Sequence, residues 1–234
     1  MVKAVLFDLG NTLIWYYVRP EIPQVLREAI TEVQSFLRGK GLLSVSLEEM
    51  WRRMEKEENY EAKDYSVRPL EGRLARVFQL DPGSEELLAA ACRRFMKPIF
   101  ARGRLYEDSL PVLRELRSKG FKTAIVSNTS WGSPASLWRE ELARHGLSGQ
   151  VDATIFCRDV GWRKPDRRIF EFTLEKLQTD ARECTFVGDD PNWDVAGPRS
   201  FGMKAILIDR QGQFQGIEEQ SIRSLHELLN RISL

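Results

Sequence analysis

The sequence has few of the features that mark disulfide-bonded, zinc-binding or membrane proteins. Its 234 residues include three cysteines, Cys92, Cys157 and Cys184, with no Cys-x-x-Cys spacing. Neither a disulfide framework nor a zinc site is expected, and we predict that the cysteines are reduced and buried. No apolar run approaches the length of a membrane span, and the first, Ala4 to Phe7, is too short for a signal-peptide core. These absences predict a soluble, cytoplasmic protein.

The charges are balanced, and histidine is scarce. Thirty-five basic residues stand against 34 acidic ones, which gives a net charge of +1. Because no overall field would attract nucleic acid or an anionic membrane, neither is expected as a partner. The two histidines, His145 and His226, lie in helical patterns and are expected to be structural. No Ser/His/Asp arrangement is visible, so an acyl-transfer hydrolase is not expected.

The remaining pattern predicts an α/β fold. Short apolar runs rich in β-branched residues are typical of buried parallel strands, and after the first run they alternate with helical patterns. This alternation predicts a doubly wound, Rossmann-like parallel sheet. The expected strands are Val2–Leu9, Phe121–Val126, Ala153–Phe156, Cys184–Val187 and Lys204–Ile208, and the helices between or after them are Asp108–Lys119, Ser133–His145, Pro165–Leu177, Asn192–Phe201 and Ser221–Ile232.

A second unit is inserted between the first two strands. A crossover between parallel strands needs only about 30 residues, and the stretch here is far longer and reads as helices throughout. The expected helices are Pro23–Arg38, Ser46–Tyr60, Leu70–Leu80 and Ser84–Met96. We therefore predict a core of residues 1–17 and 102–234 and an all-helical domain of residues 18–101, with hinges at Tyr16–Pro20 and Pro98–Gly103.

Reactive side chains follow the expected strands. In open α/β sheets, ligands bind outside the carboxyl ends of the strands, at a topological switch point. Asp8 follows the first strand and Ser127 the second, Lys164 lies in the sequence Gly-Trp-Arg-Lys-Pro-Asp after the third, and Asp189, Asp190 and Asp194 follow the fourth. We expect these side chains to converge on one edge of the sheet.

That set of groups suits phosphoryl transfer. Carboxylates without histidine or cysteine form a hard oxygen site fit for Mg²⁺. A lysine can neutralise charge on a phosphoryl oxygen, and a serine can donate a hydrogen bond to it. Asp8 could then attack phosphorus and form an acyl phosphate. Asp190 and Asp194 could alternatively cap the following helix.

The four motifs, in this order, resemble those of the haloacid dehalogenase-like (HAD) superfamily. The resemblance covers Met1 to about Tyr17 and Arg102 to Leu234, and it implies that the inserted helices form a cap domain. It implies a Mg²⁺-dependent phosphatase that acts on a small phosphorylated metabolite. The implied roles are a nucleophile at Asp8, catalytic support from Ser127 and Lys164, phosphate binding by Ser127, Asn128, Lys164 and the amides of Leu9 and Gly10, and metal binding by Asp8, the Gly10 carbonyl, Asp189 and Asp194.

One position departs from the family pattern. Phosphatases of this family usually carry a second aspartate two residues after the nucleophile, which protonates the leaving group and then activates water. Gly10 occupies that position here, and Thr12, whose hydroxyl would normally support that aspartate, loses this role. General acid–base help is worth about 10²- to 10⁴-fold. We therefore expect a slower phosphatase, activity limited to good leaving groups, or a substitute acid from the cap.

The missing aspartate keeps two alternatives open. Dehalogenases of this family also lack it and use the same nucleophile to displace halide from a 2-haloacid. However, they usually carry an aromatic residue where Gly10 stands and lack the acidic pair that binds Mg²⁺. The other alternative is a pseudoenzyme that binds Mg²⁺ and a phosphorylated ligand without turnover.

Four of the six tryptophans lie near the motifs. Trp15, Trp131, Trp162 and Trp193 are each within a few residues of one. We expect them to surround the mouth of the site, either to pack against the closing cap or to hold an apolar leaving group. No cap residue is assigned a role, although several could contribute to specificity: Trp51, Lys56, Tyr60, Lys63, Tyr65 and Arg68. A monomer and a homodimer are both compatible with the sequence.

Overall fold

The structure is a computed structural model that describes residues 2–57, 64–214 and 221–232. Its centre is a parallel sheet with the strand order β5-β4-β1-β6-β7-β8. The strands are β1 (Ala4–Phe7), β4 (Lys122–Ser127), β5 (Ala153–Phe156), β6 (Cys184–Gly188), β7 (Lys204–Ile208) and β8 (Ser221–Ile222). The chain runs outward from β1 on one side and then returns to build the other side, so the strand order reverses beside β1. The predicted doubly wound α/β core is confirmed.

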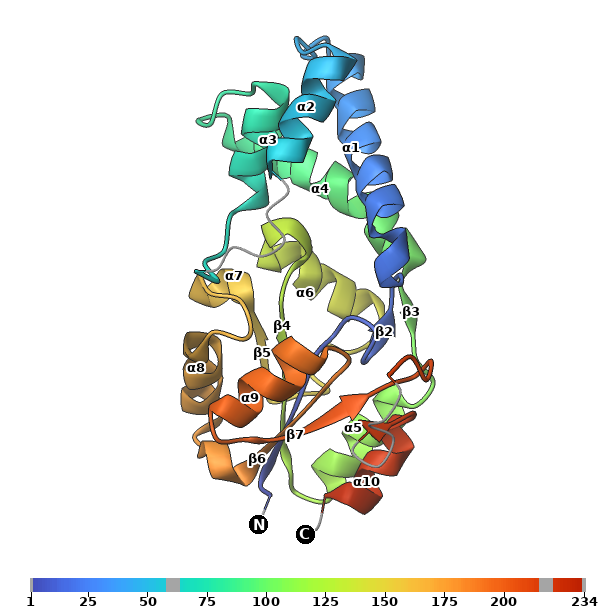
Figure 1. Ribbon diagram of the computed structural model, residues 1–234, viewed down its shortest axis with the longest axis vertical. Helices are drawn as coiled ribbons and strands as arrows, with labels where there is room; N and C mark the ends of the chain where they lie inside the picture. Colours follow the sequence, from blue (N-terminus) through green and yellow to red (C-terminus); the bar gives the residue numbers. More distant parts are fainter. Residues whose placement is uncertain (1, 58–63, 215–220, 233–234) are drawn as a thin grey trace.

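Both faces of the sheet are covered because the strands are apolar on both sides. In β1, Ala4 and Leu6 belong to one apolar cluster, whereas Val5 and Phe7 belong to another, and all four are fully buried. Successive strand side chains point to opposite faces, so each face packs against its own helices (Figure 1). Helix α8 contributes Phe170 to the first cluster, and α5 contributes Leu113 to the second.

Short helices complete the core. The core α-helices are α5 (Ser109–Ser118), α6 (Ala135–Arg144), α7 (Cys157–Val160), α8 (Arg167–Leu177), α9 (Gly197–Ser200) and α10 (Leu228–Arg231). The π-helical turn η4 (Pro191–Ala196) runs directly into α9. Among the described residues, the 3₁₀ turns of the core are η2 (Ser130–Gly132), η3 (Ala181–Glu183) and η6 (Leu225–Glu227), and η1 (Arg19–Glu21) precedes the inserted helices.

Four helices between β2 (Ile14–Trp15) and β3 (Arg104–Leu105) stand above the carboxyl edge of the sheet (Figure 1). They are α1 (Ile22–Gly39), α2 (Leu47–Glu57), α3 (Leu70–Phe78) and α4 (Glu85–Arg102), and α1 packs along α4. Residues 58–60 of the helix expected to run to Tyr60 lie outside the described residues. We call residues 18–101 the cap; the placing of its two boundaries stays a prediction.

The two chain crossings between core and cap are paired with each other. Strand β2 (Ile14–Trp15) leads out to the cap and β3 (Arg104–Leu105) leads back, and the two form an antiparallel pair. Above this pair, Arg144 donates from Nη2 to the Phe100 carbonyl at 2.6 Å. The two crossings are therefore held together by the β2–β3 pair beneath the cap helices.

Two predicted elements differ from the structure. The helix expected over Ser221–Ile232 begins only after Ser224, because Ser221 and Ile222 pair with β7 and form the edge strand β8. Ser224 then accepts from the His226 amide, and Glu227 accepts from the Ser224 amide, a capping box that marks the true helix start. The helix expected over Ser84–Met96 is also longer than expected, because α4 continues through Pro98 to Arg102. The hinge role of Pro98–Gly103 stays a prediction.

The predicted state of the cysteines is confirmed: all three are free and buried. His145 bonds Glu141 at 3.0 Å in α6 and does not line the cavity described below. Within the described residues, no helix is both long enough and apolar enough to cross a membrane.

Candidate active site

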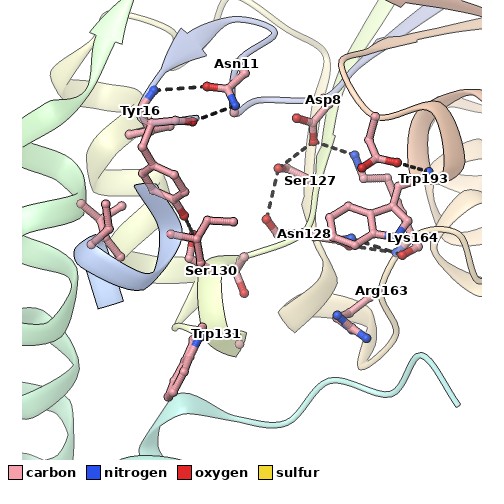
Figure 2. A pocket seen from close by; sticks show the side chains of 18 of the residues that line it. Asp8, Asn11, Tyr16, Ser127, Asn128, Ser130, Trp131, Arg163, Lys164 and Trp193 are labelled. Carbon is pink, nitrogen blue, oxygen red and sulfur yellow. Dashed lines mark hydrogen bonds and ion pairs between the residues drawn. The ribbon is translucent and has the colours of Figure 1, made fainter. Parts of the chain in front are cut away.

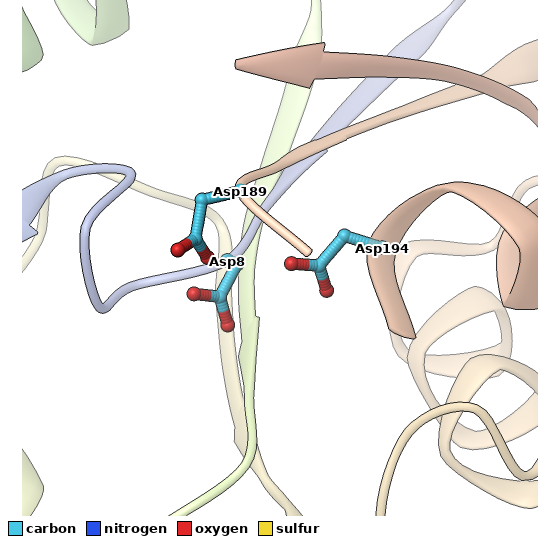
Figure 3. A group of neighbouring side chains, drawn as sticks. All are labelled: Asp8, Asp189 and Asp194. Atoms are coloured by element: carbon cyan, nitrogen blue, oxygen red, sulfur yellow. The ribbon is translucent and has the colours of Figure 1, made fainter. Parts of the chain in front are cut away.

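Three aspartates meet at the carboxyl edge of the sheet. Asp8 follows β1, Asp189 follows β6, and Asp194 lies in the π-helical turn η4. One carboxylate oxygen from each lies within 4.8 Å of the others, and Figure 3 shows the three groups gathered beside the ends of the strands. The main chain holds this arrangement, since the Asp8 amide donates to the Val187 carbonyl at 2.9 Å.

Lys164 joins two of these carboxylates. Its ammonium lies 2.6 Å from Asp8 Oδ1 and 2.7 Å from Asp194 Oδ1, and the residue is 2% exposed. Burial by itself lowers the lysine pKa, but the charges and hydrogen bonds of Asp194 and Asp8 outweigh it, so the pKa is raised. Lys164 is therefore a fixed positive charge between the two aspartates.

Ser127 and Asn128 position their neighbours. The Ser127 hydroxyl donates to Asp8 Oδ1 at 3.0 Å, on the oxygen that Lys164 also contacts (Figure 2). The Asn128 amide spans the gap to the lysine loop: its Oδ1 accepts from the Lys164 amide at 2.8 Å, and its Nδ2 donates to the Lys164 carbonyl at 3.2 Å. Because both polar atoms of the Asn128 side chain bond the Lys164 backbone, the phosphate contact expected at Asn128 would come from its backbone.

The acidic cluster has more negative charge than its surroundings neutralise. Burial raises the pKa of Asp189 well above its ordinary value, and the negative charges of Asp8 and Asp194 raise it further. Burial likewise raises the pKa of Asp194, against the opposing charge of Lys164. Three carboxylates share one ammonium, so the site is short of positive charge. An all-oxygen set of this kind fits Mg²⁺, with Asp8, Asp189 and Asp194 as the groups that would hold it.

Of the aspartates near the site, Asp190 is the one that caps the turn η4. Its Oδ1 accepts from the amides of Asn192 and Trp193 at 2.8 and 2.9 Å, and its Oδ2 forms an ion pair with Arg19 of η1. Asp194 instead accepts from the Asp190 amide at 3.1 Å and faces Lys164. Of the two aspartates whose roles the sequence left open, Asp190 caps the turn and Asp194 belongs to the acidic cluster.

The glycine that replaces the usual second aspartate lies in an open position. A Cβ on Gly10 would meet only Tyr16 Cδ2, at 3.8 Å, which is ordinary van der Waals contact. Two residues further on, the Thr12 hydroxyl is fully buried and has no hydrogen-bond partner. Since buried hydroxyls are normally paired, this orphan hydroxyl agrees with the loss of the group that Thr12 would support.

A cavity of about 510 Å³ opens from the aspartates toward the cap. Its size is within the range of small-molecule sites. Figure 2 shows Asp8 and Trp131 far apart among the side chains that line it. Trp131 and Trp193 line the cavity as expected, whereas Trp15, in β2, does not. Trp162 does not line the cavity either, but it forms a bridge with Ser66 of the cap, in agreement with the expected contact between these tryptophans and the cap.

A segment of the cap closes one side of this cavity. Ser66 forms an antiparallel bridge with Trp162, the Val67 amide donates to the Gly161 carbonyl at 2.9 Å, and the Arg163 amide donates to the Tyr65 carbonyl at 2.8 Å. These bonds join the cap to the loop that carries Lys164. The cavity is therefore formed by both domains.

Sequence reasoning missed Arg73, which lines the cavity from α3. The available signal was the helical pattern itself. Leu70, Leu74 and Val77 form the apolar face of the helix and are fully buried. Arg73 falls on that face at helical spacing and is only 5% exposed. A charged residue in an apolar stripe is an exception that calls for a partner.

Gly188 provides a test of how tightly the aspartates are held. A Cβ there would overlap the Asp194 carboxylate group. We expect Gly188→Ala to lower the free energy of unfolding by about 1–3 kcal/mol through overpacking and to weaken Mg²⁺ binding by displacing Asp194. Urea unfolding and calorimetric Mg²⁺ titration measure the two effects. Gly39→Ala, with nothing within 4 Å of the added carbon, is the control; equal stability of both variants would refute the expected overlap.

The fold and this site define a hydrolase family. The model of the haloacid dehalogenase-like hydrolases matches residues 2–202, and the chain belongs to that family. The predicted resemblance is therefore confirmed.

Individual relatives include both phosphatases and dehalogenases. Over 223 residues, the chain is 29% identical to glyceraldehyde 3-phosphate phosphatase of Methanopyrus kandleri, covering 94% of this chain and 89% of that protein. It is 26% identical to (S)-2-haloacid dehalogenase 1 of a Pseudomonas species, covering 89% and 85%. The crystal structure of a HAD phosphatase from Thermococcus onnurineus superposes with a TM-score of 0.65 at 29% identity, covering 98% and 97% of the two chains.

Proposed function

We propose that the protein is a Mg²⁺-dependent phosphatase that hydrolyses a small phosphate monoester through an aspartyl-phosphate at Asp8. The observation that carries the proposal is the acidic cluster: Asp8, Asp189 and Asp194 lie within 4.8 Å of one another, and Lys164 pairs with two of them. A relative whose alignment covers 94% of this chain is named a phosphatase, which supports the same function.

In the first half-reaction, the phosphoryl group is transferred from the substrate to Asp8. An Asp8 carboxylate oxygen attacks phosphorus, and the bond from phosphorus to the leaving-group oxygen breaks with its electron pair going to that oxygen. Ser127 and Lys164, which now hold Asp8 Oδ1, donate to the phosphoryl oxygens when substrate is bound. The amides of Leu9 and Gly10 and the backbone of Asn128 complete the phosphate contacts.

The second half-reaction is hydrolysis of the acyl phosphate. Water attacks phosphorus, the bond to the Asp8 oxygen breaks, and inorganic phosphate leaves with the carboxylate regenerated. Mg²⁺ would be held by Asp8, the Gly10 carbonyl, Asp189 and Asp194, and it would neutralise charge on the phosphoryl oxygens. Because Gly10 has no side chain to move protons, both halves proceed without the usual carboxyl acid–base, and good leaving groups are favoured.

Dehalogenation is the second candidate, and one observation favours it. Gly10 leaves the site without the second aspartate, as in dehalogenases, and a relative carries that name. The acidic cluster argues against it, because displacement of halide by Asp8 needs no cation at Asp189 and Asp194. A 2-haloacid assay of the wild type, with and without chelator, separates the two functions.

Metal binding can be tested without turnover. We expect saturating Mg²⁺ to raise the thermal unfolding temperature of the wild type, since a ligand at about 100 times its dissociation constant adds about 2.7 kcal/mol. Asp189→Asn should lose most of this shift, because it removes a proposed metal ligand. Asp180→Asn, an exposed aspartate outside the cluster, should keep it. An equal Mg²⁺ shift in Asp189→Asn would contradict the proposed metal site.

A further inference from the structure

The charges that line the cavity are unevenly distributed. Among the described residues, the acidic lining side chains follow β1 or β6 at the phosphoryl end, where Lys164 and Arg19 pair with them; these acids are Asp8, Asp189, Asp190 and Asp194. Away from this acidic cluster, the cap contributes two lining arginines, Arg68 from the segment after α2 and Arg73 from α3. A substrate that lies along the cavity has its phosphate at one end and cap arginines at the other.

Arg73 is the buried member of this pair. Its guanidinium carbon lies 3.9 Å from the centre of the Trp131 ring, and its Nη1 donates to the Trp131 carbonyl at 3.5 Å. Its Nη2 donates to the Glu57 carbonyl. The Nε is buried without a hydrogen-bond partner, although it lies 3.5 Å from Glu57 Oε2. Trp131 and Glu57 therefore hold the Arg73 guanidinium in place where the residue lines the cavity.

The negative charge near Arg73 is shared. The Glu57 carboxylate receives two hydrogen bonds from Arg76, at 2.5 and 2.9 Å, so one acid serves two guanidinium groups. Burial, together with the charges of Arg76 and Arg68, lowers the pKa of Arg73 to about 10, against the opposing effect of Glu57. A desolvated guanidinium with incomplete compensation gains from an anionic ligand.

Trp131 carries a second sign of a binding site. Its backbone is in the left-handed region, at φ 55°, which a bulky side chain rarely adopts. Such conformations persist only where the surrounding structure enforces them, and they cluster at ligand sites. Here the ring packs between Arg73 and Phe95, whose centroid lies 5.5 Å away.

We propose that the substrate's leaving group carries a second anionic group, a carboxylate or a further phosphate, and that Arg73, stacked on Trp131, binds it. This inference rests on the proposed phosphatase function. It assigns the substrate to the class of small phosphate monoesters with an anion at each end, and it makes Arg73 a specificity-determining residue. The apolar walls of the cavity contact the linker between the two anions.

Non-hydrolysable phosphonates test the proposal by binding. Calorimetry with Mg²⁺ present compares ω-phosphonocarboxylates of two to five carbons with n-alkylphosphonates of the same length, so that the span to Arg73 need not be known. At the best length, we expect the carboxylate to bind at least about 10-fold more tightly than its neutral counterpart. Alkane bisphosphonates of the same lengths show whether the distal anion is a carboxylate or a second phosphate.

Variants assign the effect to Arg73. Arg73→Met should remove the preference for the doubly anionic ligand while leaving alkylphosphonate binding unchanged, and Arg73→Lys should retain part of it. Arg76→Met is the matched control, because Arg76 binds the same Glu57 but is exposed and does not line the cavity. Thermal unfolding identifies any variant that fails to fold. If Arg73→Met does not fold, the ligand preference of Arg73→Lys is compared with that of the wild type instead.

The outcomes separate this inference from the proposed function. Alkylphosphonate binding without any preference for the second anion, at every length, overturns the inference alone. Retention of the full preference by Arg73→Met also overturns it. Failure of the folded wild type to bind any phosphonate in the presence of Mg²⁺ overturns both the inference and the phosphatase function on which it rests.

Discussion

Replacing Asp8 by asparagine is expected to abolish Mg²⁺-dependent hydrolysis of para-nitrophenyl phosphate, with a loss of about 10⁴-fold or more. The amide is a poor nucleophile, yet its Oδ1 can still accept from Ser127 and Lys164 as the Asp8 oxygen does now. The loss should therefore be chemical rather than structural. This substrate has a good leaving group, so the absence of an acid at Gly10 does not conceal an active site.

The comparison needs two controls and gives three distinct outcomes. Asp180→Asn should keep full activity, and the unfolding temperatures should show that Asp8→Asn is folded. Turnover by the wild type that disappears in Asp8→Asn supports the phosphatase. Activity retained in Asp8→Asn would show that another group is the nucleophile. A wild type that binds Mg²⁺ without turnover would favour the binding protein or the dehalogenase, which a 2-haloacid assay then tests.

Restoring the missing carboxylate should have the opposite effect on poor substrates. Gly10→Asp is expected to raise kcat/KM for an alkyl phosphate by about 10²- to 10⁴-fold, the usual value of general acid–base help. The position can accept the side chain, because its Cβ would meet only Tyr16 Cδ2 at 3.8 Å. The family resemblance implies that the unpaired Thr12 hydroxyl would then have the partner it now lacks.

The informative measurement is the gain in kcat/KM of Gly10→Asp for each of the two substrates. Para-nitrophenyl phosphate should gain far less than the alkyl ester, because its leaving group needs little protonation. Gly10→Asn has the same shape without the acid and should give no gain for either substrate. Equal rates in Gly10→Asp and the wild type would indicate a substitute acid elsewhere in the cavity or a site shaped around glycine.

Much of the core could be predicted from the chain alone because its signals are local. The β5 and β7 strands occur over the expected residues, since each is a short, mostly apolar run with an aspartate at one end, Asp152 before β5 and Asp209 after β7. Elements at the margins were less predictable. Ser221 and Ile222 become a strand only because β7 lies beside them, and Pro98 stays helical because neighbours such as Phe95 and Ile99 are buried against the rest of the protein.

The catalytic edge of the site was also predictable, for a topological reason. Parallel strands end at the same edge of a sheet, so residues that follow them must meet there. Asp8, Ser127 and Asp189 come together in this way, and Lys164 reaches Asp8 across 156 positions of sequence. Whether they perform the proposed reaction stays a prediction that the Asp8 and Asp189 variants test.

By itself, the sequence determined the class of fold, the inserted helices, the reactive groups at the strand ends and the missing acid at Gly10. Only the tertiary structure decided which cap side chains reach the site. Arg73 meets Trp131 through the packing of α3 over the η2 turn, 58 positions away. Strand order constrains the core, whereas the approach of an inserted domain depends on side-chain packing and pairings such as Ser66 with Trp162, which no local pattern encodes.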